Sequence, residues 1–306
     1  MASIQVHGSI IRINTDCLSA EVHTEGYVSG IAAGTLLDKA TGARDLGFGL
    51  DIVDFLLEPL ADEPGVAENA YHTGDLFHGN LVKRYVELPQ ICTQARKVNY
   101  EVYDFGDAVG VRQWFTYREA TYGREAGSRW EQTLVFRDGL RYVLAADEIT
   151  SANDVEHLIL RIDMPGHLKH TLGDTFEQIH LSYLGDLPSS EFVHDFPPDA
   201  RLLYQRGQSL PERMIRAYQV RLDGQPGPWL AGMTLDPGVV SEAWCHQRGY
   251  VCFIQEIGGF RVHRGERLGA AYVVGWFDDL PAMHAAYDEY RGASRLTVGE
   301  SGFGTE

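Results

Sequence analysis

Apolar residues recur at every second position along most of this chain, and that spacing limits its fold more than any other feature. Successive side chains of a β-strand point to opposite faces, so a period of two indicates strands with one buried face. The runs are rich in Val, Ile, Tyr, Phe and Trp, which favour strands. The predicted strands are Ile4–Ile13, Leu18–Thr24, Ile31–Asp38, Ala95–Tyr103, Val109–Arg118, Arg129–Phe136, Arg141–Thr150, His157–Met164, Phe176–Tyr183, Met214–Leu222, Trp229–Leu235, Val251–Glu256 and Leu268–Phe277.

Turn residues separate these runs, and Asp138-Gly139 between two of them predicts the clearest hairpin. Only Leu280–Tyr290 has helical spacing, after an acidic pair that suits a helix N-terminus. Many strands and one late helix predict an all-β, antiparallel sandwich or barrel-like fold. No linker divides the sequence, so residues 1–306 are expected to form a single domain. Two long stretches without strand spacing, Glu58–Asn80 and Ser189–Pro211, are predicted loops that either carry function or cover a sheet edge.

The charge of the chain excludes several classes of partner. It has 26 basic and 43 acidic residues, a formal charge of −17. This excess of acid repels nucleic acid and anionic membranes, and it disfavours long polyanionic polysaccharides. The sequence has neither a basic-then-apolar leader nor an apolar run of about 18 residues, so we expect a cytoplasmic protein.

Missing motifs narrow the chemistry. The four cysteines lie far apart and form no CxxC pair, so we expect reduced thiols in the core: Cys17, Cys92, Cys245 and Cys252. The sequence contains no Walker loop, no GxGxxG after a strand, no GxSxG and no HExxH. Nucleotide, nicotinamide and serine-hydrolase chemistry are therefore disfavoured, and no organic cofactor is expected.

Three segments share the order and rough spacing of segments in one protein family. Gly26–Leu46 contains a glycine-bearing strand and an Asp-Lys-Ala-Thr-Gly turn. His78-Gly79 is followed by Arg84, and Tyr250–Glu256 precedes an aromatic strand that ends at Phe277. Together they resemble the early hairpin, the sugar site and the closing strands of the galactose mutarotase (aldose 1-epimerase) superfamily. The resemblance implies an antiparallel β-supersandwich that binds sugar on a concave face.

The same resemblance implies roles for individual residues. Mutarotation needs a base at the anomeric hydroxyl and an acid at the ring oxygen of the sugar. By resemblance, Glu256 is the base, His170 or His167 is the acid, and His78 and Arg84 hold hydroxyls. The family's central His-x-Tyr-Phe-Asn strand is missing, and Met164–His170 is its nearest substitute. The fold is therefore implied more strongly than the activity.

Two further groups of residues are candidates for contact with a sugar. Tyr71, His72, Asp75 and His78 lie close together in the sequence and suit hydrogen bonds to hydroxyls; a divalent metal is the alternative if Glu256 or His246 joins them. Trp244, His246 and Arg248 precede Glu256, and an indole beside a guanidinium suits a uronic acid or another acidic sugar. The alternative for Trp244 is packing in the core.

The sequence therefore predicts a carbohydrate-active enzyme that works by acid/base proton transfer, as an epimerase or mutarotase does. One alternative is a sugar or uronate lyase that acts by β-elimination, with or without a metal, and another is a non-catalytic carbohydrate-binding domain. A hydrolase is a further alternative, because it needs two carboxylates and Asp236 and Glu242 are candidates for them. The expected partner is a mono- or oligosaccharide, a glycoside or a uronic acid. A homo-oligomer is an alternative to a monomer, because exposed sheet edges can pair with a second copy.

Overall fold

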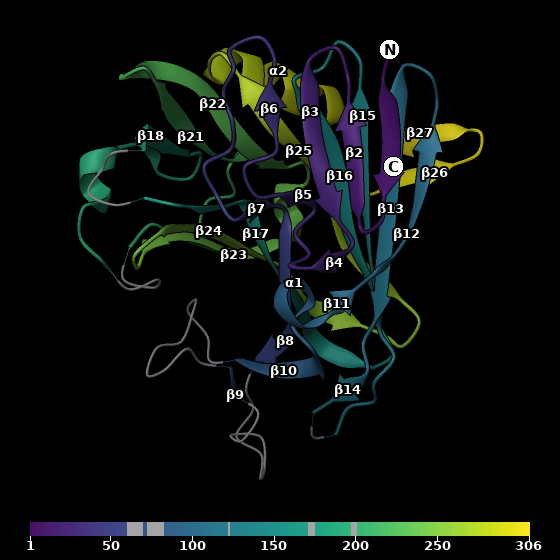
Figure 1. Ribbon diagram of the computed structural model, residues 1–306. Helices are drawn as coiled ribbons and strands as arrows, with labels where there is room; N and C mark the ends of the chain where they lie inside the picture. Colours follow the sequence, from purple (N-terminus) through teal and green to yellow (C-terminus); the bar gives the residue numbers. More distant parts are fainter. Residues whose placement is uncertain (60–69, 72–82, 122, 171–174, 197–200) are drawn as a thin grey trace.

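Two large antiparallel sheets lie face to face in the computed structural model, which describes residues 1–59, 70–71, 83–121, 123–170, 175–196 and 201–306 (Figure 1). This arrangement confirms the predicted all-β, antiparallel sandwich. The nine-stranded sheet has the order β12 (Asn99–Asp104), β13 (Ala108–Thr116), β15 (Arg129–Arg137), β16 (Tyr142–Thr150), β25 (Arg267–Phe277), β22 (Gln225–Thr234), β21 (Met214–Leu222), β18 (Phe176–Leu181) and β19 (Gly185–Pro188).

The eight-stranded sheet forms the second layer. Its order is β14 (Glu119–Ala120), β10 (Lys83–Leu88), β8 (Ile52–Pro59), β17 (Val155–Leu168), β24 (Val251–Val262), β23 (Val240–Gln247) and β20 (Leu203–Gln205), with β9 (Ala70–Tyr71) beside β10. Side chains alternate along each strand, so one face of this sheet is buried between the layers. On β24, for example, Val251, Phe253 and Ile257 belong to the main hydrophobic core. Cys252, Ile254 and Glu256 alternate with them and lie on the outer face.

The outer face of the nine-stranded sheet is covered. Helix α2 (Leu280–Tyr290) packs Met283, Ala286 and Tyr287 against a second hydrophobic cluster that includes Met233 and Val273. The side chain of Asp279 accepts a hydrogen bond from the backbone N–H of Ala282, which caps the helix as the acidic pair predicts. No helix in the described part of the chain has the length and apolar character needed to cross a membrane.

Smaller elements complete the fold. Four short strands form one sheet: β1 (Ser3–His7), β2 (Ile10–Asn14), β3 (Leu18–His23) and β6 (Leu37–Asp38). Three two-stranded pairs are β4 (Glu25–Gly26) with β11 (Arg96–Lys97), β5 (Ile31–Ala32) with β7 (Gly49–Leu50), and β26 (Leu296–Gly299) with β27 (Gly302–Thr305). The short helices are α1 (Ile91–Gln94), η2 (Ser189–Phe192) and η3 (Pro237–Val239). All four cysteines are free, as predicted, and Cys92, Cys245 and Cys252 are buried.

Several predicted elements agree with the structure and others do not. The hairpin at Asp138-Gly139 joins β15 to β16, and both β21 and α2 have the predicted bounds. The predicted strand Ile4–Ile13 is wrong, because the chain reverses at Gly8, whose φ of 64° favours glycine, and forms the hairpin β1–β2. Strands β8, β10 and β23 were not predicted, and all three belong to the eight-stranded sheet.

Candidate functional site

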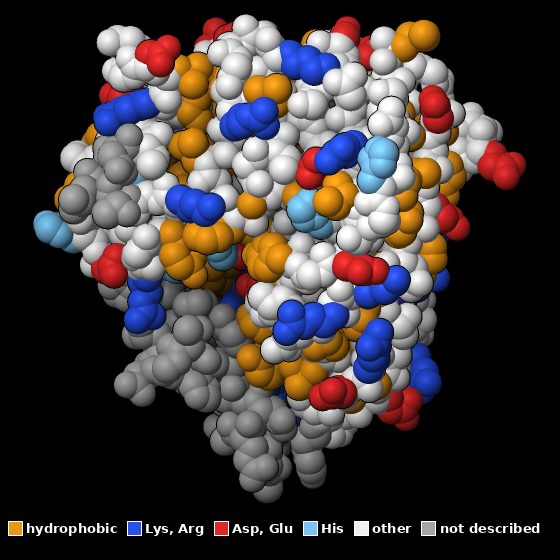
Figure 2. Space-filling view, viewed as in Figure 1, with side chains coloured by type: hydrophobic (Ala, Val, Ile, Leu, Met, Phe, Trp, Pro, Cys, Tyr) orange, Lys and Arg blue, Asp and Glu red, His pale blue; other side chains and the backbone are white. Residues whose placement is uncertain are grey.

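The outer face of the eight-stranded sheet carries polar and aromatic side chains where the other outer face carries a helix. Figure 2 shows this side of the molecule hollowed, with hydrophobic side chains around the hollow and acidic ones visible within it. Strand register decides which residues meet there. Glu256 on β24 pairs with Arg161 on β17 and with Glu242 on β23, and Ile254 pairs with Asp163 and Trp244 in the same way.

One pocket on this face, the aromatic pocket, has a volume of about 490 Å³. Its aromatic walls come from loops and from strands β8 and β10: Tyr27, Phe48, Phe55, Tyr85 and Tyr250. The rings contact one another, since Phe55 lies 5.3 Å from Tyr85 and Phe48 lies 5.3 Å from Tyr250, measured between ring centroids. Flat aromatic faces at such a site suit the apolar side of a pyranose ring.

Asp163 and His167 form an ion pair in this pocket. Four residues along a regular strand would separate them by roughly 13 Å. An irregularity in β17 between Asp163 and Gly166 shortens the path, and His167 Nε2 lies 2.6 Å from Asp163 Oδ2. Gly166 makes the irregularity fit, because a Cβ there would lie 2.0 Å from the carbonyl oxygen of Gly49. The His167 ring also stacks on Tyr250, at 5.2 Å between centroids.

Burial and charge set the protonation of two groups in the aromatic pocket. Burial raises the pKa of the Asp54 carboxyl, the nearby Asp163 carboxylate raises it further, and the value reaches about 6. Burial alone would lower the pKa of His167, but the charge of Asp163 outweighs it and holds that pKa well above its usual value. Near neutral pH, the pocket therefore holds an imidazolium that can donate a proton and a carboxylate, Asp54, that can accept one.

Asp54 is held in place by the short helix that follows β10. The amide Nε2 of Gln90 donates a hydrogen bond to Asp54 Oδ1 at 2.5 Å, and the thiol of Cys92 lies 3.3 Å from the same oxygen. Burial and the charge of Asp54 both raise the pKa of the Cys92 thiol. The thiol therefore serves as a hydrogen-bond donor to Asp54 and not as a nucleophile.

A second pocket of about 370 Å³, the charged pocket, adjoins the first on the same face. At its floor, Lys83 Nζ lies 3.1 Å from Glu242 Oε2 and 3.2 Å from Glu256 Oε2. Glu256 Oε1 accepts a hydrogen bond from Arg161 Nε at 3.0 Å. The two cations and two carboxylates balance, and all four side chains are buried or nearly so. Ion pairs removed from water in this way hold each other in fixed positions.

The structure brings together four of the residues predicted for the site. Glu256 lies at the floor of the charged pocket, and His167 and His246 line the aromatic pocket. Trp244 lies between the pockets with its side chain fully buried, and the Arg161 guanidinium sits 5.2 Å from the centre of its ring. Arg248 belongs to the turn between β23 and β24 and has an exposed side chain that lines neither pocket.

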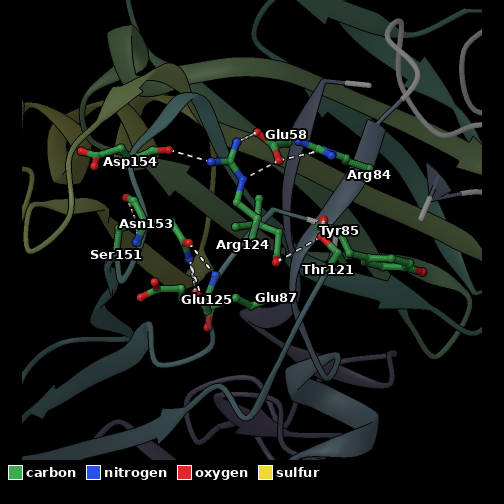
Figure 3. Close-up of polar contacts among 11 residues, drawn as sticks. Glu58, Arg84, Tyr85, Glu87, Thr121, Arg124, Glu125, Ser151, Asn153 and Asp154 are labelled. Atoms are coloured by element: carbon green, nitrogen blue, oxygen red, sulfur yellow. Dashed lines mark hydrogen bonds and ion pairs between the residues drawn. The ribbon is translucent and has the colours of Figure 1, made fainter. Parts of the chain in front are cut away.

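Two other predicted site residues lie elsewhere. His170 is buried against Phe176 of the opposite sheet, at 4.4 Å between ring centroids, and Thr175 Oγ1 lies 2.8 Å from its Nδ1. Arg84 faces away from the pockets, because it alternates with Lys83 and Tyr85 along β10. Figure 3 shows Arg84 and Arg124 converging on Glu58, and Arg84 Nε lies 2.8 Å from Glu58 Oε1. Arg84 therefore stabilises the edge of the sheet.

The remaining predicted residues belong to one segment. His72, Asp75 and His78 lie outside the described residues, and so does most of the predicted loop Glu58–Asn80. Tyr71 is in β9 and pairs with Lys83. Among the residues that the structure does describe, no three His, Cys, Asp or Glu side chains gather as a metal site. The metal site suggested for His72, Asp75 and His78 stays a prediction.

Sequence reasoning missed Asp54, Asp163, Lys83 and Arg161. Their positions did contain a signal, because charged residues are rarely buried without a partner. Asp163 and Arg161 interrupt the apolar run of β17, and Asp54 interrupts that of β8. Which of these charges share a face depends on strand register, and the sequence does not reveal it.

No family model matches the chain, and no curated protein matches it by sequence. Among solved structures, an α-mannosidase from Enterococcus faecalis matches over 94% of this chain and 31% of its own, with 9% identity and a TM-score of 0.50. A galactose 1-epimerase from Lactobacillus acidophilus matches over 91% of this chain and 98% of its own, with 9% identity and a TM-score of 0.41.

A third match is a GH36 α-galactosidase from Geobacillus stearothermophilus, which covers 96% of this chain and 44% of its own, with 12% identity and a TM-score of 0.47. This chain therefore spans less than half the length of the α-mannosidase and of this α-galactosidase. At such low identities the likeness is one of fold alone. The α-mannosidase match agrees with the antiparallel β-sandwich predicted from the sequence.

Proposed function

We propose that this chain is a carbohydrate-active enzyme that interconverts the anomers of a sugar by acid/base proton transfer in the aromatic pocket. The observation that carries this proposal is the composition of that pocket. It places an imidazolium, held 2.6 Å from a buried carboxylate, together with a second carboxyl among aromatic rings. An acid and a base of this kind are what proton transfer at the anomeric centre requires.

In this mechanism His167 is the acid and Asp54 is the base. Asp54 takes the proton from the anomeric hydroxyl while His167 gives one to the ring oxygen, and the bond between the anomeric carbon and the ring oxygen breaks. The open-chain aldehyde turns about its first carbon–carbon bond, and the reverse transfers close the ring. Asp163 acts through His167, because it keeps that imidazole charged.

Glu256, the base that the resemblance implies, has a different setting. Its carboxylate accepts from Arg161 and lies within ion-pair distance of Lys83. The carboxylate is the shared acceptor of two buried ion pairs, so its oxygens face Arg161 and Lys83 and are not free to take a proton from a substrate. We therefore assign the proton transfer to Asp54, and we assign Glu256 to the floor of the charged pocket.

The lyase alternative needs a cation to neutralise a uronate carboxylate. On this face Lys83 and Arg161 already pair with Glu242 and Glu256. The guanidinium of Arg206, which also lines the charged pocket, donates to two backbone carbonyls. The net charge of −17 also disfavours an anionic substrate. Both facts favour a neutral sugar and an epimerase.

The test follows the approach to anomeric equilibrium of freshly dissolved aldoses by polarimetry, with ultraviolet absorbance recorded in parallel. We expect catalysed interconversion, and we expect His167→Asn to lower kcat/KM by about 100-fold or more. His180→Asn is the matched control, because His180 forms a similar pair with Asp186 at 2.7 Å on the other sheet. An unsaturated, ultraviolet-absorbing product from a uronate would instead support the lyase. Equal activity of the two histidine variants would refute the assignment.

A further inference from the structure

The two pockets on the outer face adjoin along two strands. On β10, Lys83 lines the charged pocket, and Tyr85, the next residue on the same face, lines the aromatic pocket. On β24, Glu256 and Ile254 are related in the same way. Two residues along a strand span roughly 7 Å, so side chains of the two pockets are immediate neighbours. The pockets are two parts of one groove.

The length of this groove exceeds one sugar ring. On β23, Glu242 lines the charged pocket and His246 lines the aromatic pocket. Four residues of a strand separate them, roughly 13 Å. A single pyranose bound between His167 and Asp54 would leave the charged pocket to be filled by something else. The natural occupant is a second ring joined to the first.

The lining of the charged pocket suits hydroxyl groups. Lys83, Glu242 and Glu256 fix donors and acceptors at its floor, and their charges are balanced once Arg161 is counted. Gln205 and Ser241 add neutral polar groups to its lining. Arg206 also lines this pocket, and its guanidinium donates to the backbone carbonyls of Gly238 and Val239. Fixed donors and acceptors of this kind bind sugar hydroxyls.

Between the pockets, Trp244 contributes an unused donor. Its indole Nε1 is buried and has no hydrogen-bond partner in the part of the chain that the structure describes. Buried polar groups in proteins are almost always hydrogen-bonded, so an unpaired one needs an explanation. Because the Trp244 side chain is fully buried and lines neither pocket, this donor lies beneath the groove and does not itself identify a ligand.

We propose that the charged pocket is a second sugar subsite, so that the ligand is a neutral carbohydrate of at least two rings whose reducing ring occupies the aromatic pocket. This inference rests on the proposed function for the position of the reducing ring. It narrows the substrate class from monosaccharides to disaccharides and longer glycans.

Binding can be measured separately from catalysis by titrating methyl glycosides, whose blocked anomeric carbon cannot mutarotate. The probes are methyl glycosides of glucose and galactose, and those of maltose, cellobiose and lactose, each titrated calorimetrically. We expect at least one disaccharide to bind tenfold or more tightly than its monosaccharide. Gln205→Trp should abolish that advantage, because Gln205 pairs with Glu242 across β20 and β23 and the indole would fill the charged pocket.

The control for added bulk is Gln225→Trp, an exposed position at the start of β22 in the other sheet. If Gln205→Trp does not fold, Ser241→Tyr fills the same pocket from β23. The proposal is overturned if no disaccharide binds tenfold more tightly than its monosaccharide, or if the advantage survives in the variant that fills the pocket. Failure of the proposed function would look different: disaccharides would bind, but no reducing sugar would show catalysed mutarotation.

Discussion

Asp163 is the residue on which the proposed chemistry depends most, although it is neither the acid nor the base. Its side chain is 1% exposed and pairs with His167. It raises the pKa of His167 and also contributes to the raised pKa of Asp54. One carboxylate therefore sets the protonation of both partners in the proton transfer.

This arrangement predicts the pH dependence of kcat/KM. The wild-type profile should fall below about pH 6, where Asp54 takes up a proton, and fall again at alkaline pH, where His167 loses one. In Asp163→Asn both pKa values should drop, since the remaining burial lowers that of His167 and the repulsion on Asp54 is gone. Both limbs should then move to lower pH. Stationary limbs would contradict the account, and Asp186→Asn, beside His180, is the matched control.

The elements that build the site are the ones that were hardest to predict. Alternating strands with clear turns, such as β15, β16 and β21, follow the hydrophobic pattern closely. In β8 and β23, charged residues interrupt the apolar positions. The alternation therefore fails at two carboxylates that line the pockets, Asp54 and Glu242. Local pattern thus predicted the sandwich and some site residues, whereas register and the irregularity in β17 decided which residues meet.

A buried acid pair joins two other elements of the sandwich. Asp51 precedes β8, and Asp147 lies on β16, where its Oδ1 accepts hydrogen bonds from Trp130 Nε1 at 2.8 Å and Gln132 Nε2 at 3.1 Å. Burial raises the pKa of both carboxyls, and that of Asp51 reaches about 6. A raised folded-state pKa means that the unfolded chain releases these protons at lower pH. The pair should therefore lower stability as pH rises from about 4 through 6 and above.

Asp147→Asn tests this linkage. The amide keeps the Oδ1 acceptor for Trp130 and Gln132 and removes one titrating group from the core. We expect the variant to be more stable than the wild type by more than about 1 kcal/mol at pH 7.5, the equivalent of roughly one pKa unit. The difference should shrink toward pH 4 in urea unfolding measured across that range. A variant less stable at every pH would show that the pair is not a source of strain.

At the scale of the whole molecule, the two outer faces of the sandwich differ. Helix α2 and the hairpin β26–β27 lie against the nine-stranded sheet (Figure 1). They cover it with apolar side chains such as Met283, Tyr287 and Val298. The eight-stranded sheet instead presents the groove formed by the aromatic and charged pockets. The candidate ligand site therefore lies on the face that helix α2 leaves open.

The most direct test of the central claim is a crystal structure of the protein soaked with a methyl glycoside of a disaccharide. We predict that the ring carrying the methyl group lies in the aromatic pocket, with its anomeric and ring oxygens within hydrogen-bond distance of Asp54 and His167. A sugar bound elsewhere, for example in the hollow beside β2 and β3 that Arg12 and Glu21 line, would contradict the account.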